Sequence, residues 1–138
     1  MISKKLKGNY LFWVSLIILC LIIIAWFLYF RIQEDNWMRN SQGMYEEHGN
    51  PAIMPDYVAI QKNAINCAYE KYNLAKLNGT IFNSQCLGTC GEYAVDIVSS
   101  PRNEEDNKIE NQCKAYRIGS VKKFIELDKE GKLLLVHE

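Results

Sequence analysis

The sequence lacks the short motifs that mark common enzymes and nucleotide-binding proteins. Among its 138 residues there is no phosphate-binding glycine loop, no nucleophile elbow, no zinc-protease helix motif and no haem-attachment motif. Histidine is scarce: His48 and His137 are the only two, and their positions predict no shared metal site. No internal repeat or low-complexity tract occurs. Scattered carboxylates alone define no acid–base pair, so the sequence favours a role other than catalysis.

Charge is also absent, over a long N-terminal run. Residues 8–30, GNYLFWVSLIILCLIIIAWFLYF, contain no Asp, Glu, Lys or Arg. The 21 residues from Tyr10 to Phe30 give a helix of roughly 31 Å, close to the hydrocarbon thickness of a bilayer. Fourteen of them are Leu, Ile, Val or Phe, which together favour insertion by roughly −7 kcal/mol. No small-residue cleavage site follows the run. We therefore expect residues 10–30 to cross the lipid bilayer as one helix.

The charges that flank this span predict its orientation. Three lysines precede it and two arginines follow closely: Lys4, Lys5, Lys7, Arg31 and Arg39. This bias predicts a cytoplasmic basic tail over residues 1–9, a span in the cytoplasmic (plasma) membrane, and everything after the span outside. Residues 31–138 hold 13 basic against 16 acidic residues, a net charge of −3. This part has no basic stripe, so nucleic acid is not an expected partner.

Cysteine gives an independent indication of the compartment. Four of the five cysteines lie beyond the span: Cys67, Cys86, Cys90 and Cys113. An even number of cysteines in a small extracytoplasmic domain predicts a disulfide framework, because that side of the membrane is oxidising. The fifth, Cys20, lies in the middle of the span and is expected to act as a small apolar side chain.

The remaining sequence predicts a stalk and one small domain. Residues 31–54 are polar and broken by Gly and Pro, which predicts a stalk or linker. Residues 55–138 begin with a helix over 56–77, where one apolar stripe recurs at steps of three and four residues. The members of that stripe are Tyr57, Ile60, Ala64, Ala68, Tyr72 and Ala75.

Strand signals fill most of the rest of the domain. Alternation predicts a strand over 93–98, and AYRIGS at 115–120 is a candidate short strand. A hairpin is expected from 124–127 to 133–136, with its turn at 128–131. The acidic residues between 102 and 112 predict a solvated loop. We expect an α+β fold in which the amphipathic helix packs on an antiparallel sheet of about three to four strands, stabilised by disulfides.

Four cysteines allow three pairings, which depend on how the strands meet. If residues 92–98 and 114–119 form a hairpin, Cys90 and Cys113 lie at opposite ends, roughly 26 Å apart. This arrangement excludes a Cys90–Cys113 bond, strains a Cys86–Cys113 bond, and favours Cys86–Cys90 with Cys67–Cys113. If the two segments are not partners, Cys67–Cys86 with Cys90–Cys113 becomes the better choice.

The spacing of Cys86 and Cys90 also raises a chemical hypothesis. A short, exposed disulfide between them would be of the kind that exchanges with other thiols. As thiolates, the same pair would suit Cu(I). A redox motif of known mechanism has two intervening residues and begins a helix, whereas here three residues intervene and a strand follows. We therefore favour the interpretation that Cys86 and Cys90 have a purely structural role, and we expect no cofactor.

The N-terminus resembles the leader of type IV prepilins in its lysines, Gly8 and following apolar helix. Those leaders are usually followed by Glu at the fifth mature position, where this chain has Trp13. The resemblance covers the first 30 residues and implies a pilin-like or pseudopilin-like subunit. The sequence as a whole predicts a membrane-anchored extracytoplasmic domain that is a binding or accessory subunit of an envelope assembly. The alternatives are a thiol–disulfide or copper-handling protein that uses Cys86 and Cys90, and the pilin-like subunit.

Overall fold

The computed structural model describes the backbone of residues 2–34 and 36–138, and the side chains of residues 10–30 and 36–138. The chain divides into two compact units. The first comprises the N-terminal segment up to Asn36 together with Glu47–Ala52, and the second comprises Trp37–Glu46 and Ile53–Glu138.

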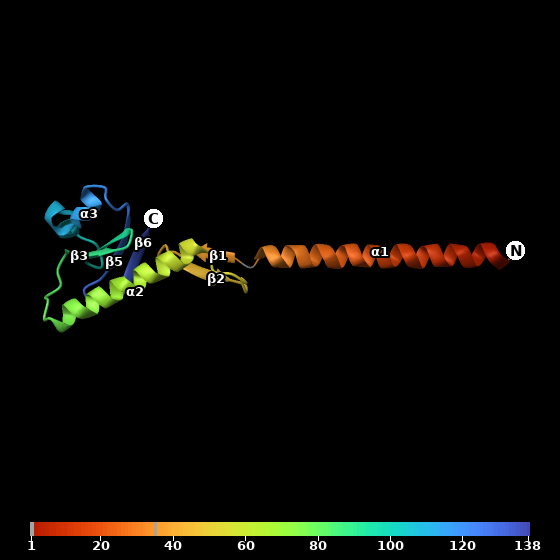
Figure 1. Cartoon of the computed structure of the whole chain (residues 1–138), viewed down its shortest axis with the longest axis horizontal. Helices are drawn as coiled ribbons and strands as arrows, with labels where there is room; N and C mark the ends of the chain where they lie inside the picture. Colours follow the sequence, from red (N-terminus) through yellow and green to blue (C-terminus); the bar gives the residue numbers. More distant parts are fainter. Residues whose placement is uncertain (1, 35) are drawn as a thin grey trace. The chain divides into compact units, whose positions relative to one another are not determined.

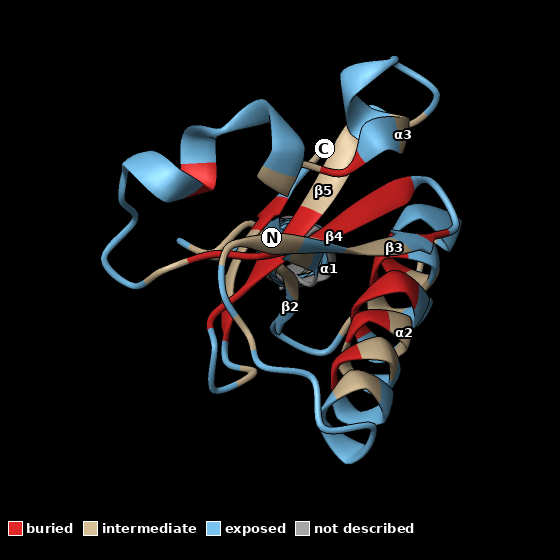
Figure 2. Cartoon of the chain, turned by 90° about the vertical axis from the view of Figure 1, so that its left-hand side faces the viewer, coloured by how far each residue is buried: buried red, intermediate tan, exposed pale blue. Residues whose placement is uncertain are grey.

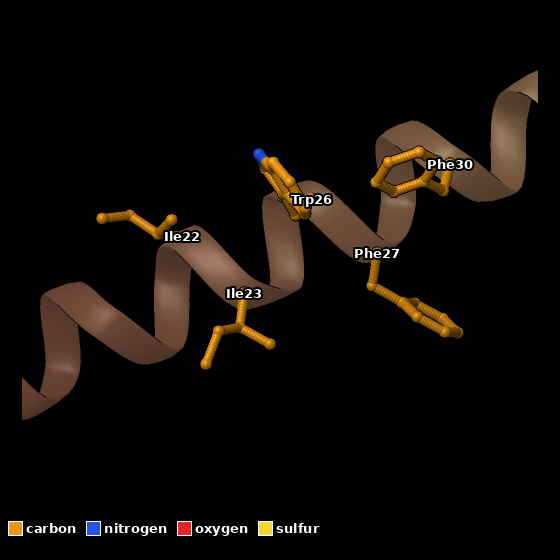
Figure 3. A pocket seen from close by; sticks show the side chains of 5 residues that line it. All are labelled: Ile22, Ile23, Trp26, Phe27 and Phe30. Atoms are coloured by element: carbon orange, nitrogen blue, oxygen red, sulfur yellow. The ribbon is translucent and has the colours of Figure 1, made fainter.

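One helix, α1 (Ile2–Glu34), makes up most of the first unit (Figure 1). Its segment Tyr10–Phe30 has a mean hydropathy of 2.9, and none of its side chains is buried. Figure 3 shows Ile22, Trp26 and Phe27 pointing outward from different sides of the ribbon. In the described part of the chain, α1 is the single helix long and apolar enough to cross a membrane. The expected apolar helix at residues 10–30 is therefore present.

The second unit is built on a four-stranded sheet with the order β3-β4-β5-β6. Its strands are β3 (Gln85–Cys90), β4 (Tyr93–Ile97), β5 (Lys123–Leu127) and β6 (Leu133–His137). The β3–β4 and β5–β6 pairs are antiparallel, and both are hairpins. The β4–β5 pair is parallel, because the chain makes a long crossover between these two strands. The expected α+β fold is confirmed, with this one parallel pair in the sheet.

Helix α2 (Asp56–Leu77) covers one side of the sheet and has the predicted bounds (Figure 2). Ala64, Ala68 and Tyr72 pack with the residues of β4 that face them, Tyr93, Val95 and Ile97. The predicted stripe is wrong at its N-terminal end, where Tyr57 and Ile60 are 48% and 47% exposed. Val58 and Gln61 are buried there instead, because Gln61 hydrogen-bonds to the chain before the helix.

A short hairpin precedes α2 in the region expected to be a stalk. It is formed by β1 (Asn36–Arg39) and β2 (Tyr45–His48). The turn between them belongs to the second unit: Gln42 O accepts a hydrogen bond from Val136 N at 2.7 Å, and Gln42 Nε2 donates to Leu133 O at 2.7 Å. Gln42 therefore connects the turn of this hairpin to β6, and residues 37–46 belong to the second unit.

The crossover from β4 to β5 contains only short helical turns, on the side of the sheet opposite α2 (Figures 1 and 2). These turns are η1 (Glu104–Asn107), η2 (Ile109–Asn111) and α3 (Lys114–Arg117). The expected strand at 115–120 is wrong, because the amides of Tyr116 and Arg117 donate to Cys113 O and close a helical turn. The acidic loop is not wholly solvated either: Asp106 is 2% exposed and accepts hydrogen bonds from Ser99 N and Asn103 N.

Candidate functional site

Two disulfides connect the cysteines of the second unit. Cys67 on α2 is bonded to Cys90 on β3, with a Cα–Cα distance of 5.9 Å. Cys86 on β3 is bonded to Cys113, which precedes α3, with a Cα–Cα distance of 4.8 Å. Neither expected pairing scheme is present, and the Cys86–Cys113 bond, which the expected hairpin would strain, is formed. In the part of the chain that the structure describes, Cys20 is the one free cysteine.

A β-bulge in β3 explains this pairing. Cys90 lies opposite Tyr93, and Cys86 lies opposite Asp96, with a register shift between Cys86 and Gly88. In a regular strand, residues four apart face the same side, but an extra residue reverses that relation. Cys90 therefore faces α2 together with Tyr93, while Cys86 faces the other side together with Asp96. Each cysteine meets its partner on its own side of the sheet.

The hairpin assumed between residues 92–98 and 114–119 is absent. The two neighbours of β4 are β3 and β5, and the segment after Cys113 is helical. Cys113 instead lies across β4, where its backbone N–H donates to Asp96 Oδ1 at 3.2 Å. The 26 Å separation that disfavoured the Cys86–Cys113 bond therefore does not arise.

The two sulfurs of the Cys86–Cys113 disulfide have different surroundings. Cys86 is exposed, and its Sγ accepts a hydrogen bond from Gly88 N at 3.1 Å. Cys113 is 1% exposed, and its Sγ lies 3.3 Å from Gly88 O and 3.4 Å from Val95 O. One sulfur thus faces solvent and an N–H donor, whereas the other is enclosed by carbonyl oxygens.

Asp96 places a carboxylate beside both sulfurs. A carboxylate oxygen of Asp96 and the Sγ atoms of Cys86 and Cys113 all lie within 4.8 Å of one another. Burial raises the pKa of Asp96 to about 6, and the charge of Glu126, its cross-strand neighbour on β5, adds to this rise. The Cys113 N–H and the charge of Arg102, which is ion-paired with Glu126, act in the opposite direction. Asp96 is therefore able to gain or lose a proton near neutral pH.

The structure does not bring Cys86 and Cys90 together as a dithiol. They belong to different disulfides on opposite faces of the sheet. The sulfurs beside Asp96 are bonded to each other and are therefore not two thiolate ligands for a metal. The redox and copper hypotheses for a Cys86–Cys90 pair thus lack the geometry that they require. Cys86 with Cys113 is the combination that the fold places beside an ionisable group.

A second polar cluster surrounds the side chain of Glu138. Tyr93 Oη donates to it at 2.6 Å, Tyr45 Oη donates at 3.1 Å, and Arg39 forms an ion pair with it. Burial acts to raise the pKa of Glu138, but these hydrogen bonds and the charge of Arg39 outweigh it and lower the pKa. Gln61, which is 0% exposed, also donates to Glu138, at 3.3 Å. Every polar group of the cluster has a partner within the chain, so its arrangement is that of a structural tie.

Described residues of the second unit also line two hollows. A polar one of about 410 Å³ lies beside the β4–β5 crossover, lined by Asn83, Ser84, Ser99, Asn103, Glu105, Asn111 and Lys129. The other, of about 240 Å³, is a groove between α2 and the β3–β4 turn. Its lining residues are Ile60, Asn63, Ala64, Cys67, Cys90, Gly91 and Glu92.

No family model matches this sequence, and no curated protein or solved structure is significantly similar to it. The resemblance of the N-terminus to prepilin leaders therefore stays a prediction. Sequence reasoning named all four disulfide cysteines but missed Asp96, which looked like an ordinary outward-facing charge in an alternating strand. The signal that was present is its position between two buried neighbours, Val95 and Ile97, in a strand near cysteines.

Proposed function

We propose that this protein is a single-pass membrane protein that displays a small binding domain outside the cytoplasmic membrane. In this role it is an accessory subunit of an envelope assembly, with its N-terminus in the cytoplasm. The observation that carries the proposal is the combination, in one chain, of an uncharged 21-residue helix segment without buried side chains and a domain closed by two disulfides.

The composition of α1 supports the membrane anchor. Segment Tyr10–Phe30 exposes apolar side chains on all sides. Exposure of this surface to water is unfavourable, whereas contact with lipid is favourable. Trp13 and Trp26 lie near the two ends of the segment, where amphipathic rings suit the membrane interfaces. The hollow among Ile22, Ile23, Trp26, Phe27 and Phe30 in Figure 3 is lined by a single helix and suits packing of acyl chains.

The disulfides support an oxidising compartment for the domain. All four cysteines outside α1 are paired, while Cys20 within the apolar segment is free. Such pairing persists outside the cytoplasm and is rare within it, where thiols are kept reduced. The lysines before the span favour the same orientation.

The exposed part of α2 supports a protein partner. Tyr57 and Ile60 are about half exposed, and Ile60 also lines the groove beside the Cys67–Cys90 disulfide. Ile53, three residues before the start of the helix, is 79% exposed as well. Exposed apolar side chains next to a groove with a polar rim are typical of a surface that binds an apolar side chain of another protein.

Site-specific photo-cross-linking in intact membranes tests this function. A benzophenone amino acid is placed at Ile60 and, as a control on the same helix, at the exposed Glu70. We expect one discrete cross-linked protein from position 60 and none from position 70, and we expect the protein to resist carbonate extraction. A monomer without cross-links at position 60, or release by carbonate, would count against the proposal. Loss of the first eight residues in the intact mass would favour the pilin-like alternative.

A further inference from the structure

The two disulfides differ in how a thiol from solution can reach them. Cys86 is exposed and its partner Cys113 is 1% exposed, whereas Cys67 is half-buried and Cys90 is 3% exposed. In thiol–disulfide exchange a thiolate attacks one sulfur and expels the other, so the reaction depends on access to the attacked sulfur. Cys86 is the accessible sulfur of its pair, and Cys113 is then the leaving sulfur.

The polar groups around the two sulfurs determine what this direction of attack requires, because the leaving sulfur must accept the electron pair of the broken bond. The Gly88 N–H that hydrogen-bonds to Cys86 Sγ stabilises negative charge on that sulfur. The carbonyl oxygens of Gly88 and Val95 beside Cys113 Sγ accept a hydrogen bond from a thiol but repel a thiolate. These oxygens disfavour the departure of Cys113 as a bare thiolate, so Cys113 needs a proton as the bond breaks.

Asp96 is placed to provide that proton. Its carboxylate lies within 4.8 Å of both sulfurs, on the face of the sheet opposite α2. The charged and polar groups that face it are Glu126 on β5, Arg102 in the crossover and the backbone N–H of Cys113. Because burial raises the pKa of Asp96 to about 6, the protonated acid is present at mildly acidic and near-neutral pH.

We propose that the Cys86–Cys113 disulfide exchanges with a dithiol of a partner protein, and that Asp96 transfers the proton at Cys113. A partner thiol loses its proton to solvent, and its thiolate attacks Cys86 Sγ. The Cys86–Cys113 bond breaks, its electron pair passes to Cys113 Sγ, and Cys113 takes the proton of the Asp96 carboxylic acid. A mixed disulfide between the partner and Cys86 remains.

The second thiol of the partner completes the exchange. It gives its proton to the Asp96 carboxylate and attacks the partner sulfur of the mixed disulfide. Cys86 leaves as a thiolate that the Gly88 N–H stabilises, and it takes a proton from solvent. The partner dithiol has become a disulfide, and Cys86 and Cys113 have become thiols, so two electrons and two protons have moved. This activity is additional to the proposed binding role and does not depend on it.

Reduction of the oxidised full-length protein in detergent by dithiothreitol tests this inference. Samples are quenched with acid, alkylated and mapped, which gives a separate opening rate for each disulfide in the wild-type protein. We expect Cys86–Cys113 to open about tenfold faster than Cys67–Cys90, and glutathione disulfide added to the reduced protein to label Cys86 and not Cys113. Equal rates, faster opening of Cys67–Cys90, or labelling at Cys113 would overturn the proposal.

The pH profile separates proton transfer by Asp96 from a structural effect. Relative to the concentration of dithiothreitol thiolate, the wild-type rate constant for opening Cys86–Cys113 should fall as pH rises through about 6, because the acid form of Asp96 is lost. In Asp96→Asn it should be about tenfold lower and independent of pH. The control Glu130→Gln removes an exposed carboxylate at the β5–β6 turn and should leave both rates unchanged. A profile that Asp96→Asn does not alter would refute the role of Asp96.

Discussion

Cys86 and Cys90 lie four residues apart on β3 and face opposite sides of the sheet. Their disulfides therefore connect the strand to different layers: Cys90 to helix α2, and Cys86 to the crossover that ends in α3. Each bond closes a loop of moderate length, with sequence separations of 23 and 27 residues. Strand β3, at the edge of the sheet, is thus held from both faces.

Removing either disulfide should destabilise the domain to a similar degree. In the chain-entropy model, loops of this length contribute about 3.5 kcal/mol each. We expect Cys67→Ala/Cys90→Ala and Cys86→Ala/Cys113→Ala each to lower the free energy of unfolding by about 3–4 kcal/mol. Pulse proteolysis of the detergent-solubilised protein in urea measures this quantity. Cys20→Ala, which removes the free cysteine, is the matched control and should leave the free energy of unfolding unchanged. Double variants that are as stable as the wild-type protein would contradict this prediction.

Gly131 at the β5–β6 turn should not tolerate a side chain. Its φ is +86°, and a Cβ there would lie 2.4 Å from a ring atom of Tyr72 in the core. Gly119 has a similar φ of +73°, but a Cβ there meets no atom within 4 Å. Gly131→Ala should therefore cost roughly 3 kcal/mol or more, and Gly119→Ala about 1–2 kcal/mol from backbone strain alone. Thermal unfolding of the two variants checks the difference, and equal losses would show that Tyr72 moves aside freely.

Gln61 should be more important for stability than a polar residue on α2 normally is. It is fully buried, accepts a hydrogen bond from Tyr45 N at 2.8 Å and donates to Gly43 O at 3.0 Å. Gln61→Ala leaves these backbone groups without their partner, which should cost about 1–3 kcal/mol. Hydrogen exchange should become faster at the Tyr45 amide. Asn66→Ala, at an exposed position of the same helix, should leave both the stability and the hydrogen exchange at Tyr45 unchanged. If hydrogen exchange at the Tyr45 amide is the same in Gln61→Ala as in the wild type, Gln61 does not hold this segment.

Asp96 should make the stability of the domain depend on pH. Its pKa is about 6 in the folded protein, against 3.8 for an unperturbed aspartate side chain, so the folded state binds the proton more tightly. The stabilisation by this proton is complete below about pH 4 and is lost as pH rises through about 6. Because the side chain is partly exposed, the loss is at most about 3 kcal/mol.

Comparison with Asp96→Asn isolates that contribution. The amide oxygen can still accept the Cys113 N–H, but the side chain no longer titrates. The stability of the variant relative to wild type should increase between pH 4 and 7, in urea unfolding followed at several pH values. A difference that stays constant over this range would mean that the Asp96 carboxyl has an ordinary pKa.

Local patterns in the sequence were enough to predict the elements that are stabilised by local interactions. Helix α2 has its predicted bounds because Pro55 and Asp56 suit a helix start and Gly79 follows its end. The β5–β6 hairpin was predicted from its turn, where Asp128 Oδ1 accepts hydrogen bonds from Glu130 N and Lys132 N. In both, the deciding contacts lie within a few residues of one another.

The disulfide site depends on contacts that the local pattern does not contain. Strand β3 includes Gly88, which is typical of a loop, and its bulge changes the face on which Cys86 lies. The parallel pairing of β4 with β5 places Asp96 opposite Glu126, thirty residues further along the chain. The Cys86–Cys113 bond and the position of Asp96 follow from this bulge and this strand pairing. The alternation of apolar and polar residues along one strand does not predict either of them.

The most direct test of the account combines disulfide mapping with sidedness in intact cells. Free thiols are blocked with a membrane-impermeant maleimide, the protein is digested without reduction, and chymotryptic cleavage after Leu87 separates Cys86 from Cys90. We expect Cys67–Cys90 and Cys86–Cys113 peptides, and digestion of the domain by protease added outside sealed cells. A domain that external protease cannot reach, with all four cysteines open to alkylation only after lysis, would contradict it.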